Sequence, residues 1–372
     1  MWPLPYGVSY NSYLIDDEMV ALVDTVDICY FEVYLRKIKQ VIGERPINYL
    51  IINHMEPDHS GSIRLIKQHY PEIIIVGNKQ TFGMIEGFYG VTGEQYLVKE
   101  GDFLALGHHK LRFYMTPMVH WPETMMTFDE TDGVLFSGDG FGCFGTVDGG
   151  FLDTRINVDK YWGEMVRYYS NIVGKYGSPV QKALQKLGGL PISAICSTHG
   201  PVWTENIAKV IGIYDRLSRY DADEGVVIAY GSMYGNTEQM AEAIAEELSA
   251  QGVKNIVMHN VTKSHPSYIL ADIFRYKGLI IGSPTYSNQI FPEVEALLSK
   301  ILLREVKGRY LGYFGSFTWA GAAVKRLAEF AEKSKFELVG DPVEMKQAMK
   351  DLTYTQCENL ARAMADRLKK DR

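Results

Sequence analysis

The sequence has few cysteines, no long hydrophobic run and no excess of basic residues, and each absence excludes a class of protein. Its four cysteines, at positions 29, 143, 196 and 357, form no C-x-x-C pair, which argues against zinc ribbons, iron–sulfur motifs and disulfide frameworks. No apolar run approaches the ~20 residues of a membrane-spanning helix. The net charge of −7 argues against nucleic acid as a partner. The first residues resemble no secretory signal, so we expect a cytoplasmic protein that binds neither nucleic acid nor membrane.

The composition is that of a globular protein, with 46% hydrophobic and 22% charged residues, and 372 residues suffice for two domains. In the first half, short apolar runs are separated by turns. Two of them, 10–15 and 19–25, predict a hairpin around Asp16-Asp17. Further strands are predicted at 47–53, 72–77, 110–115, 124–128 and 134–138, and helices at 33–41, 62–69, 79–88 and 159–187.

The second half alternates between strand and helix patterns. Apolar strands are predicted at 225–232, 255–261, 277–284 and 309–316, and the first of them precedes an amphipathic helix over 237–250. This alternation predicts a doubly wound parallel sheet. The polar segment 218–224 separates the two halves, which differ in their predicted secondary structure. We therefore expect one domain over 1–222 and a second over 223–372.

Seven potential metal ligands lie at the ends of predicted strands. His54, Glu56, Asp58 and His59 form the pattern H-x-E-x-D-H directly after the strand 47–53. Three more ligands follow later strands, namely His120, Asp139 and His199. Four imidazoles and three carboxylates suit a site for two metal ions in which one carboxylate bridges the pair.

This pattern resembles the metallo-β-lactamase fold, an αββα sandwich whose hydrolases usually carry H-x-H-x-D-H and bind two zinc ions. Here Glu56 replaces the second histidine, and a third carboxylate suits non-haem iron. Glutamate at this position is the hallmark of the flavodiiron proteins, or A-type flavoproteins, which the sequence resembles over nearly its whole length. The resemblance implies one iron bound by His54, Glu56 and His120, another bound by Asp58, His59 and His199, and Asp139 as the bridge.

Three loops of the second half predict a flavin site. The first reads Ser232-Met233-Tyr234-Gly235-Asn236-Thr237 and opens a helix, whose N-terminus attracts phosphate. It resembles the flavodoxin phosphate loop S/T-x-S/T-G-x-S/T, with Tyr234 in one hydroxyl position. In a parallel sheet the loops after the next strands converge on it. These supply backbone donors and aromatic rings, at Pro284, Thr285, Tyr286 and Asn288 and at Ser316, Phe317, Thr318, Trp319, Ala320 and Gly321. Together the loops predict bound FMN.

The resemblance implies an oxidoreductase that reduces dioxygen to water, nitric oxide to nitrous oxide, or both. Electrons would pass from an external donor through FMN to the two irons. The family also implies a head-to-tail homodimer or a dimer of dimers. The sequence contains no rubredoxin-like C-P-x-C-G segment, so we expect the donor to be a separate rubredoxin-like protein or a reduced coenzyme.

Two other functions are compatible with the sequence. The chain could be a dizinc hydrolase of the metallo-β-lactamase fold with an accessory flavodoxin-like module, or an electron-transfer protein whose first half is a docking scaffold. The sequence also departs from the family at its start, because the pattern GVSYNSYL begins at Gly7, where members usually carry a preceding hairpin. We expect the lack of this hairpin to expose a sheet edge.

Overall fold

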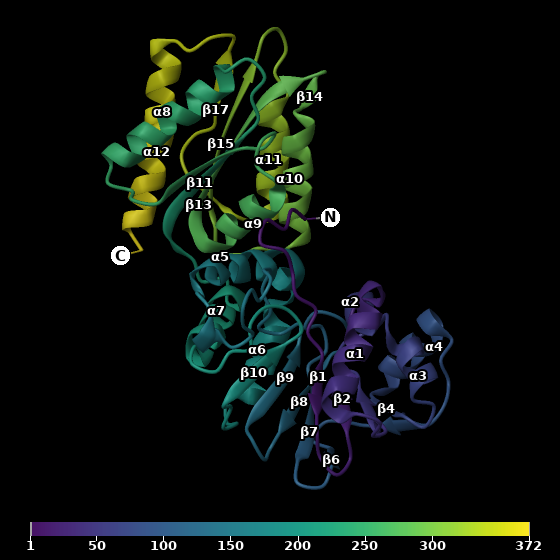
Figure 1. Cartoon of the computed structure of the whole chain (residues 1–372). Coiled ribbons are helices and arrows are strands. Elements are labelled where there is room, and N and C mark those ends of the chain that lie inside the picture. Colours follow the sequence, from purple (N-terminus) through teal and green to yellow (C-terminus); the bar gives the residue numbers. More distant parts are fainter. Residues whose placement is uncertain (1, 372) are drawn as a thin grey trace. The chain divides into compact units, whose positions relative to one another are not determined.

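The computed structural model describes residues 2–371, which form two compact units (Figure 1). The first unit comprises Leu4–Ser218, and the second comprises Arg219 and the residues that follow it, together with residues 2–3. The boundary expected between residues 222 and 223 lies in the same connecting segment and stays a prediction. None of the helices in residues 2–371 combines the length and apolar content that crossing a bilayer requires.

Two five-stranded sheets form the centre of the first unit. The first sheet has the order β1-β2-β3-β4-β5, and the second has the order β10-β9-β8-β7-β6. The predicted hairpin is confirmed, since β1 and β2 pair antiparallel, whereas β2 to β5 pair in parallel. The strands of the first sheet are β1 (Tyr13–Ile15), β2 (Ala21–Val23), β3 (Tyr49–Ile51), β4 (Ile74–Gly77) and β5 (Gln95–Leu97). Those of the second are β6 (Phe103–Ala105), β7 (Lys110–Met115), β8 (Met125–Asp129), β9 (Val134–Gly138) and β10 (Ala194–Ser197).

Helices flank the two sheets, which completes the predicted αββα sandwich (Figure 1). Alternation along β3 explains the layers, because Leu50 packs into the cluster with the helices while Ile51 packs between the sheets. The helices beside the first sheet are α1 (Phe31–Ile42), α2 (Pro57–Ser60), α3 (Ile63–His69) and α4 (Lys79–Tyr89). Those beside the second are α5 (Asp159–Tyr168), α6 (Gly177–Leu187) and α7 (Ile207–Ser218).

The single helix predicted over 159–187 is wrong in its middle. After α5 the chain forms a π-helical segment, Tyr169–Val173, and a 3-10 turn, Gly174–Tyr176, before α6 begins. Glycines at 174 and 177 weaken a continuous α-helix here. Wider π-helical turns often accompany functional sites, and this one begins next to Tyr168, whose side chain is buried.

The second unit is a parallel sheet of the flavodoxin type, as predicted. Its strand order is β12-β11-β13-β15-β16, with β17 also paired in parallel to β15 and the short β14 paired antiparallel to β13. The strands are β11 (Asp223–Tyr230), β12 (Ile256–Asn260), β13 (Tyr276–Tyr286), β14 (Gln289–Ile290), β15 (Tyr310–Phe317), β16 (Glu337–Leu338) and β17 (Val343–Lys346). The helices are α8 (Asn236–Ala250), α9 (Pro266–Arg275), α10 (Pro292–Leu303), α11 (Ala323–Ser334) and α12 (Asp351–Lys369).

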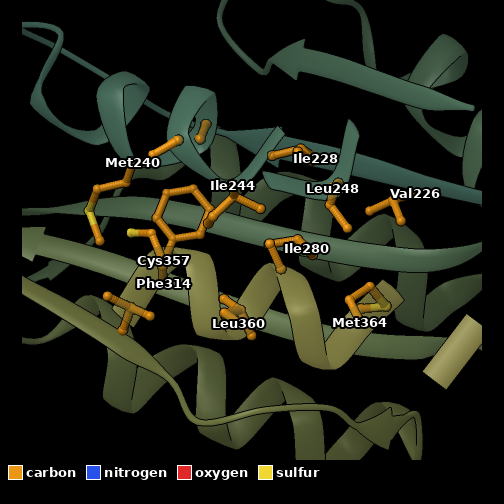
Figure 2. Close-up of a cluster of buried hydrophobic side chains, with 14 of the residues drawn as sticks. Val226, Ile228, Met240, Ile244, Leu248, Ile280, Phe314, Cys357, Leu360 and Met364 are labelled. Carbon is orange, nitrogen blue, oxygen red and sulfur yellow. The ribbon is translucent and has the colours of Figure 1, made fainter. Parts of the chain in front are cut away.

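Helices α8 and α12 bury one face of this sheet (Figure 2). On α8, Ile244 and Leu248 lie four residues apart and therefore share one face of the helix. On α12 the same spacing brings Leu360 and Met364 onto the sheet. The ring of Phe314, from β15, lies in the same buried cluster.

One buried cation also stabilises the second unit. The guanidinium of Arg309 donates hydrogen bonds to the backbone carbonyls of Tyr220, Ile273, Phe274 and Lys307. Burial lowers the pKa of Arg309 to about 10, although it remains a cation at neutral pH. The side chain thus joins the end of α9 to the segment that precedes β11.

Candidate functional site

The first unit brings all seven predicted metal ligands together at the ends of its strands. His54 follows β3, and Asp58 and His59 lie on the short helix α2, which Pro57 begins. His120 lies in the loop between β7 and β8, Asp139 follows β9, and His199 follows β10. Their donor atoms form two groups, each with its members within 4.8 Å of one another, namely His54, Glu56, His120 and Asp139, and Asp58, His59 and His199.

Asp139 lies between the two groups and presents one carboxylate oxygen to each. Its Oδ2 is 3.0 Å from Nε2 of His120 and 3.7 Å from Nε2 of His54. Its Oδ1 is 3.1 Å from Nε2 of His59 and 3.8 Å from Nε2 of His199. This is the arrangement that a carboxylate bridging two metal ions requires.

The remaining carboxylates complete one group each. Oε2 of Glu56 lies 3.1 Å from Nε2 of His120 and 3.5 Å from Nε2 of His54. Oδ2 of Asp58 lies 3.3 Å from Nε2 of His59 and 3.4 Å from Nε2 of His199. Each group therefore contains two imidazoles, one carboxylate of its own and one oxygen of Asp139.

The polar atoms of the cluster fit metal ions better than they fit one another. Nε2 of His54 and Oδ1 of Asp58 are buried and have no hydrogen-bond partner among residues 2–371. Nε2 of His59 and Nε2 of His199 face each other at 3.0 Å, although both are imidazole nitrogens. A divalent cation in each group would satisfy these atoms, and histidine with carboxylate ligands suits iron.

The charges around the cluster stabilise its ligands in their ionised forms. Burial alone would raise the pKa of Glu56, but His120 and His54 lower it to about 2. Burial also opposes ionisation of Asp139, yet His59, His54 and His120 hold its pKa well below the usual range. Both carboxylates are therefore anionic at neutral pH and available to a cation.

The second unit brings the three predicted flavin loops together at the carboxyl ends of β11, β13 and β15. The Oγ atoms of Thr237, in the first loop, and Ser316, at the end of β15, lie 2.8 Å apart and are hydrogen-bonded. Thr285, at the end of β13, accepts hydrogen bonds from the backbone N–H groups of Ala322 and Ala323. A side-chain hydrogen bond thus links the first loop to the third, and side-chain-to-backbone bonds link the second loop to the residues that follow the third.

The same loops combine an open helix end with exposed aromatic rings. Gly235 begins α8 with a φ of 89°, a conformation that favours glycine, and no side chain caps the helix. Its first N–H groups are therefore available to a phosphate. Tyr234 and Trp319 are 88% and 81% exposed, and Tyr286 is half-exposed. Exposed rings beside a phosphate cradle fit the flat ring of a flavin.

Comparisons with known proteins agree with the domain assignment of both units. The family model described as ODP family beta lactamase matches residues 8–200, and the flavodoxin model matches residues 228–360. The anaerobic nitric oxide reductase flavorubredoxin of Vibrio vulnificus is 33% identical over 89% of this chain and 68% of its own length. The chain belongs to the flavodiiron protein family.

Two solved structures resemble this flavodiiron protein over almost its whole length. Rubredoxin oxygen:oxidoreductase of Desulfovibrio gigas superposes with a TM-score of 0.95 at 31% identity, over 99% of this chain and 92% of the other. The flavodiiron protein of Giardia intestinalis superposes with a TM-score of 0.91 at 27% identity, over 98% of this chain and 91% of the other.

Residues that the sequence pattern did not identify form hydrogen bonds with the predicted ligands of this flavodiiron protein. The hydroxyl of Thr198 donates to Oδ1 of Asp139 at 2.6 Å. Nδ1 of His199 lies 2.7 Å from the backbone carbonyl of Ser9, and Nδ1 of His54 lies 2.9 Å from Oε1 of Glu123. Glu123 is three residues from the predicted ligand His120, and this short spacing is the one signal that the sequence offers for it.

Tyr168 is a second residue that sequence reasoning missed. Its ring centroid lies 5.5 Å from that of His199, and its buried hydroxyl has no hydrogen-bond partner among the described residues. Burial raises the pKa of this hydroxyl well above the usual range, and the Asp139 carboxylate raises it further. The phenol therefore stays protonated beside the ligand cluster and can act as a donor there.

Proposed function

We propose that this flavodiiron protein reduces dioxygen to water, nitric oxide to nitrous oxide, or both. The position of Asp139 between two donor groups carries the proposal, because it provides for a pair of metal ions in adjacent positions. The relatives are named for both gases, as an anaerobic nitric oxide reductase and as an oxygen oxidoreductase. They favour this activity over that of a dizinc hydrolase.

The seven ligands would divide between two iron ions. We assign His54, Glu56 and His120 to the first position, Asp58, His59 and His199 to the second, and Asp139 to both. Two irons held there, with FMN in the second unit, would supply the electrons and the adjacent binding positions that a diatomic gas needs. The chain itself excludes water from most of the centre, since His54, His59 and Asp139 are buried.

The residues of the flavin loops would hold and orient FMN and would take no part in the reaction themselves. The loop from Ser232 to Thr237 and the N-terminus of α8 would hold the phosphate. The two other loops would contribute backbone donors to the polar edge of the ring, at Pro284, Thr285, Tyr286 and Asn288 and at Ser316, Phe317, Thr318, Trp319, Ala320 and Gly321. The rings of Tyr286 and Trp319 would cover its faces.

We also propose an external electron donor and a head-to-tail homodimer or dimer of dimers. The donor would be a rubredoxin-like protein or a reduced coenzyme, and both proposals rest on membership of the family. Light scattering at several protein concentrations measures the oligomer. Reduction of the flavin by rubredoxin and by NADH, each alone, distinguishes the two classes of donor.

The metal and flavin content of the purified protein tests the proposal most directly. We expect a yellow protein with about two irons and one FMN per chain. After full anaerobic reduction, stopped-flow mixing with dioxygen and with nitric oxide should reoxidise the flavin with at least one gas. Two zinc ions without flavin, together with ester or lactam hydrolysis in the absence of a reductant, would establish the hydrolase instead.

Removing the Tyr168 hydroxyl should slow gas reduction. Tyr168→Phe keeps the ring against His199 but deletes the buried donor near Asp139, so we expect turnover to fall by about 10–100-fold. Iron and FMN contents should not change. Gas consumption at an electrode measures the effect, and Tyr161→Phe, which removes a hydroxyl bonded to the Thr146 carbonyl, is the matched control. Equal rates in the two variants would exclude a role for Tyr168 in turnover.

A further inference from the structure

Glu123 is a fully buried carboxylate that contacts a proposed ligand from behind. Its Oε1 lies 2.9 Å from Nδ1 of His54 and 2.9 Å from the backbone nitrogen of Met55. The N–H of Met55 can only donate, so Oε1 must accept. Its other oxygen, Oε2, has no hydrogen-bond partner among residues 2–371. A buried carboxylate with one free oxygen is costly unless positive charge lies nearby, and a metal ion bound by His54 would provide that charge.

The contact fixes the tautomer of His54. When Nδ1–H donates to Glu123, the lone pair of the ring is on Nε2, which points toward Glu56 and Asp139. A carboxylate behind an imidazole also makes its metal-binding nitrogen more basic. Glu123 can therefore prepare His54 for a metal ion without touching the ion.

The backbone around Glu123 is itself held in place. The side-chain amide of Asn78 donates to the Glu123 carbonyl at 2.6 Å, and the side-chain oxygen of Asn78 caps the start of α4. Two structural elements thus restrain Glu123, the N-terminus of α4 on one side and the segment after β3 on the other. A carboxylate restrained in this way can orient the imidazole ring that it contacts.

In the second donor group, no carboxylate among the described residues contacts the Nδ1 atoms of the two imidazoles. Nδ1 of His199 contacts the neutral backbone carbonyl of Ser9. Nδ1 of His59 is buried and has no partner among the described residues. The two groups contain the same number of imidazoles and carboxylates but differ in what stands behind the imidazoles.

We propose that Glu123 is a positioning residue that makes the metal position of His54, Glu56 and His120 the tighter of the two. The inference rests on the proposed two-iron centre. It predicts that iron occupies the two positions one after the other, and that the position of His54, next to Glu123, is occupied first. Loss of the negative charge at residue 123 should weaken that position selectively.

Anaerobic titration of the metal-free holoflavoprotein with ferrous iron tests the inference. The wild type should bind two irons in two resolved steps. In Glu123→Gln, which keeps the shape and one oxygen acceptor, affinity at the first step should fall by about 10–100-fold, so that the steps merge. Mössbauer spectra at one equivalent of iron-57 should show one environment in the wild type and a mixture in the variant. Asp153→Asn is the control, since Asp153 is a buried acceptor in the same unit whose bonds go to residues 204–206.

Each outcome bears on a different statement. A wild type that binds fewer than two irons contradicts the proposed function. A wild type that binds two irons, with a Glu123→Gln variant of unchanged affinity and spectrum, contradicts the role of Glu123 alone. Equal weakening of both positions, or the same loss in Asp153→Asn, also overturns the inference. If Glu123→Gln does not fold, Glu123→Asp decides in its place, because its shorter side chain withdraws the carboxylate from Nδ1 of His54 and should also weaken that position selectively.

Discussion

Replacing Asp139 with alanine should empty both metal positions and stop gas reduction. Asp139 presents Oδ2 to the group of His54 and His120 and Oδ1 to the group of His59 and His199, so one substitution removes a ligand from each position. Loss of a residue behind a ligand costs about 10–100-fold in metal affinity or activity, and loss of a shared ligand should exceed that range. We expect turnover to fall more than ~100-fold.

The measurement pairs metal analysis with flavin absorbance. Asp139→Ala should retain about one FMN per chain, because the flavin loops belong to the other unit, while bound iron falls below one per chain. Asp148→Ala, which removes a mostly exposed carboxylate from the same unit, should keep both cofactors. Normal electron delivery to an acceptor by Asp139→Ala would favour the third interpretation, an electron-transfer protein with a docking scaffold.

Phe314→Ala should destabilise the second unit by about 3–5 kcal/mol. The ring is fully buried among the side chains that α8 and α12 place on the sheet (Figure 2). It also covers Gly282 of β13, where an added Cβ would collide with the ring. Alanine would leave a cavity in a cluster that is restrained on several sides, and such sites relax little.

Urea unfolding of the whole chain reports on this unit when it is monitored by the rise in FMN fluorescence as the flavin is released. The midpoint should fall with little change in slope. Leu352→Ala, on an exposed side chain of α12, is the matched control and should change the free energy of unfolding by less than about 0.5 kcal/mol. A loss below ~1 kcal/mol for Phe314→Ala would mean that the cluster collapses around the cavity.

The ligands could be predicted from the sequence because each one follows a strand. A strand is recognised from a few apolar residues, and the ends of neighbouring parallel strands meet at one edge of a sheet. His54 follows β3 of the first sheet and Asp139 follows β9 of the second, so strand ends marked the candidates but their convergence on one site was expected from the resemblance to the metallo-β-lactamase fold. The convergence of the flavin loops could be predicted from strand ends alone, since β11, β13 and β15 are neighbouring parallel strands of one sheet.

The residues behind the ligands could not be derived in this way. Glu123 contacts His54 across 69 positions of sequence, and no periodic pattern links the two. Tyr168 reaches the cluster from the junction of α5 with a π-helical turn, and helical periodicity cannot predict a change of helical pitch. These side chains are chosen by packing and polar satisfaction, which depend on the assembled fold.

The buried guanidinium of Arg309 also ties a residue that precedes β11 to the second unit. One of its acceptors is the carbonyl of Tyr220, which precedes the first residue of β11 by three positions. Without that carbonyl, the cation would lose a hydrogen bond in a place that water does not reach. Tyr220 is therefore part of the second unit although it precedes β11, because its carbonyl binds a buried side chain of the flavodoxin-like fold.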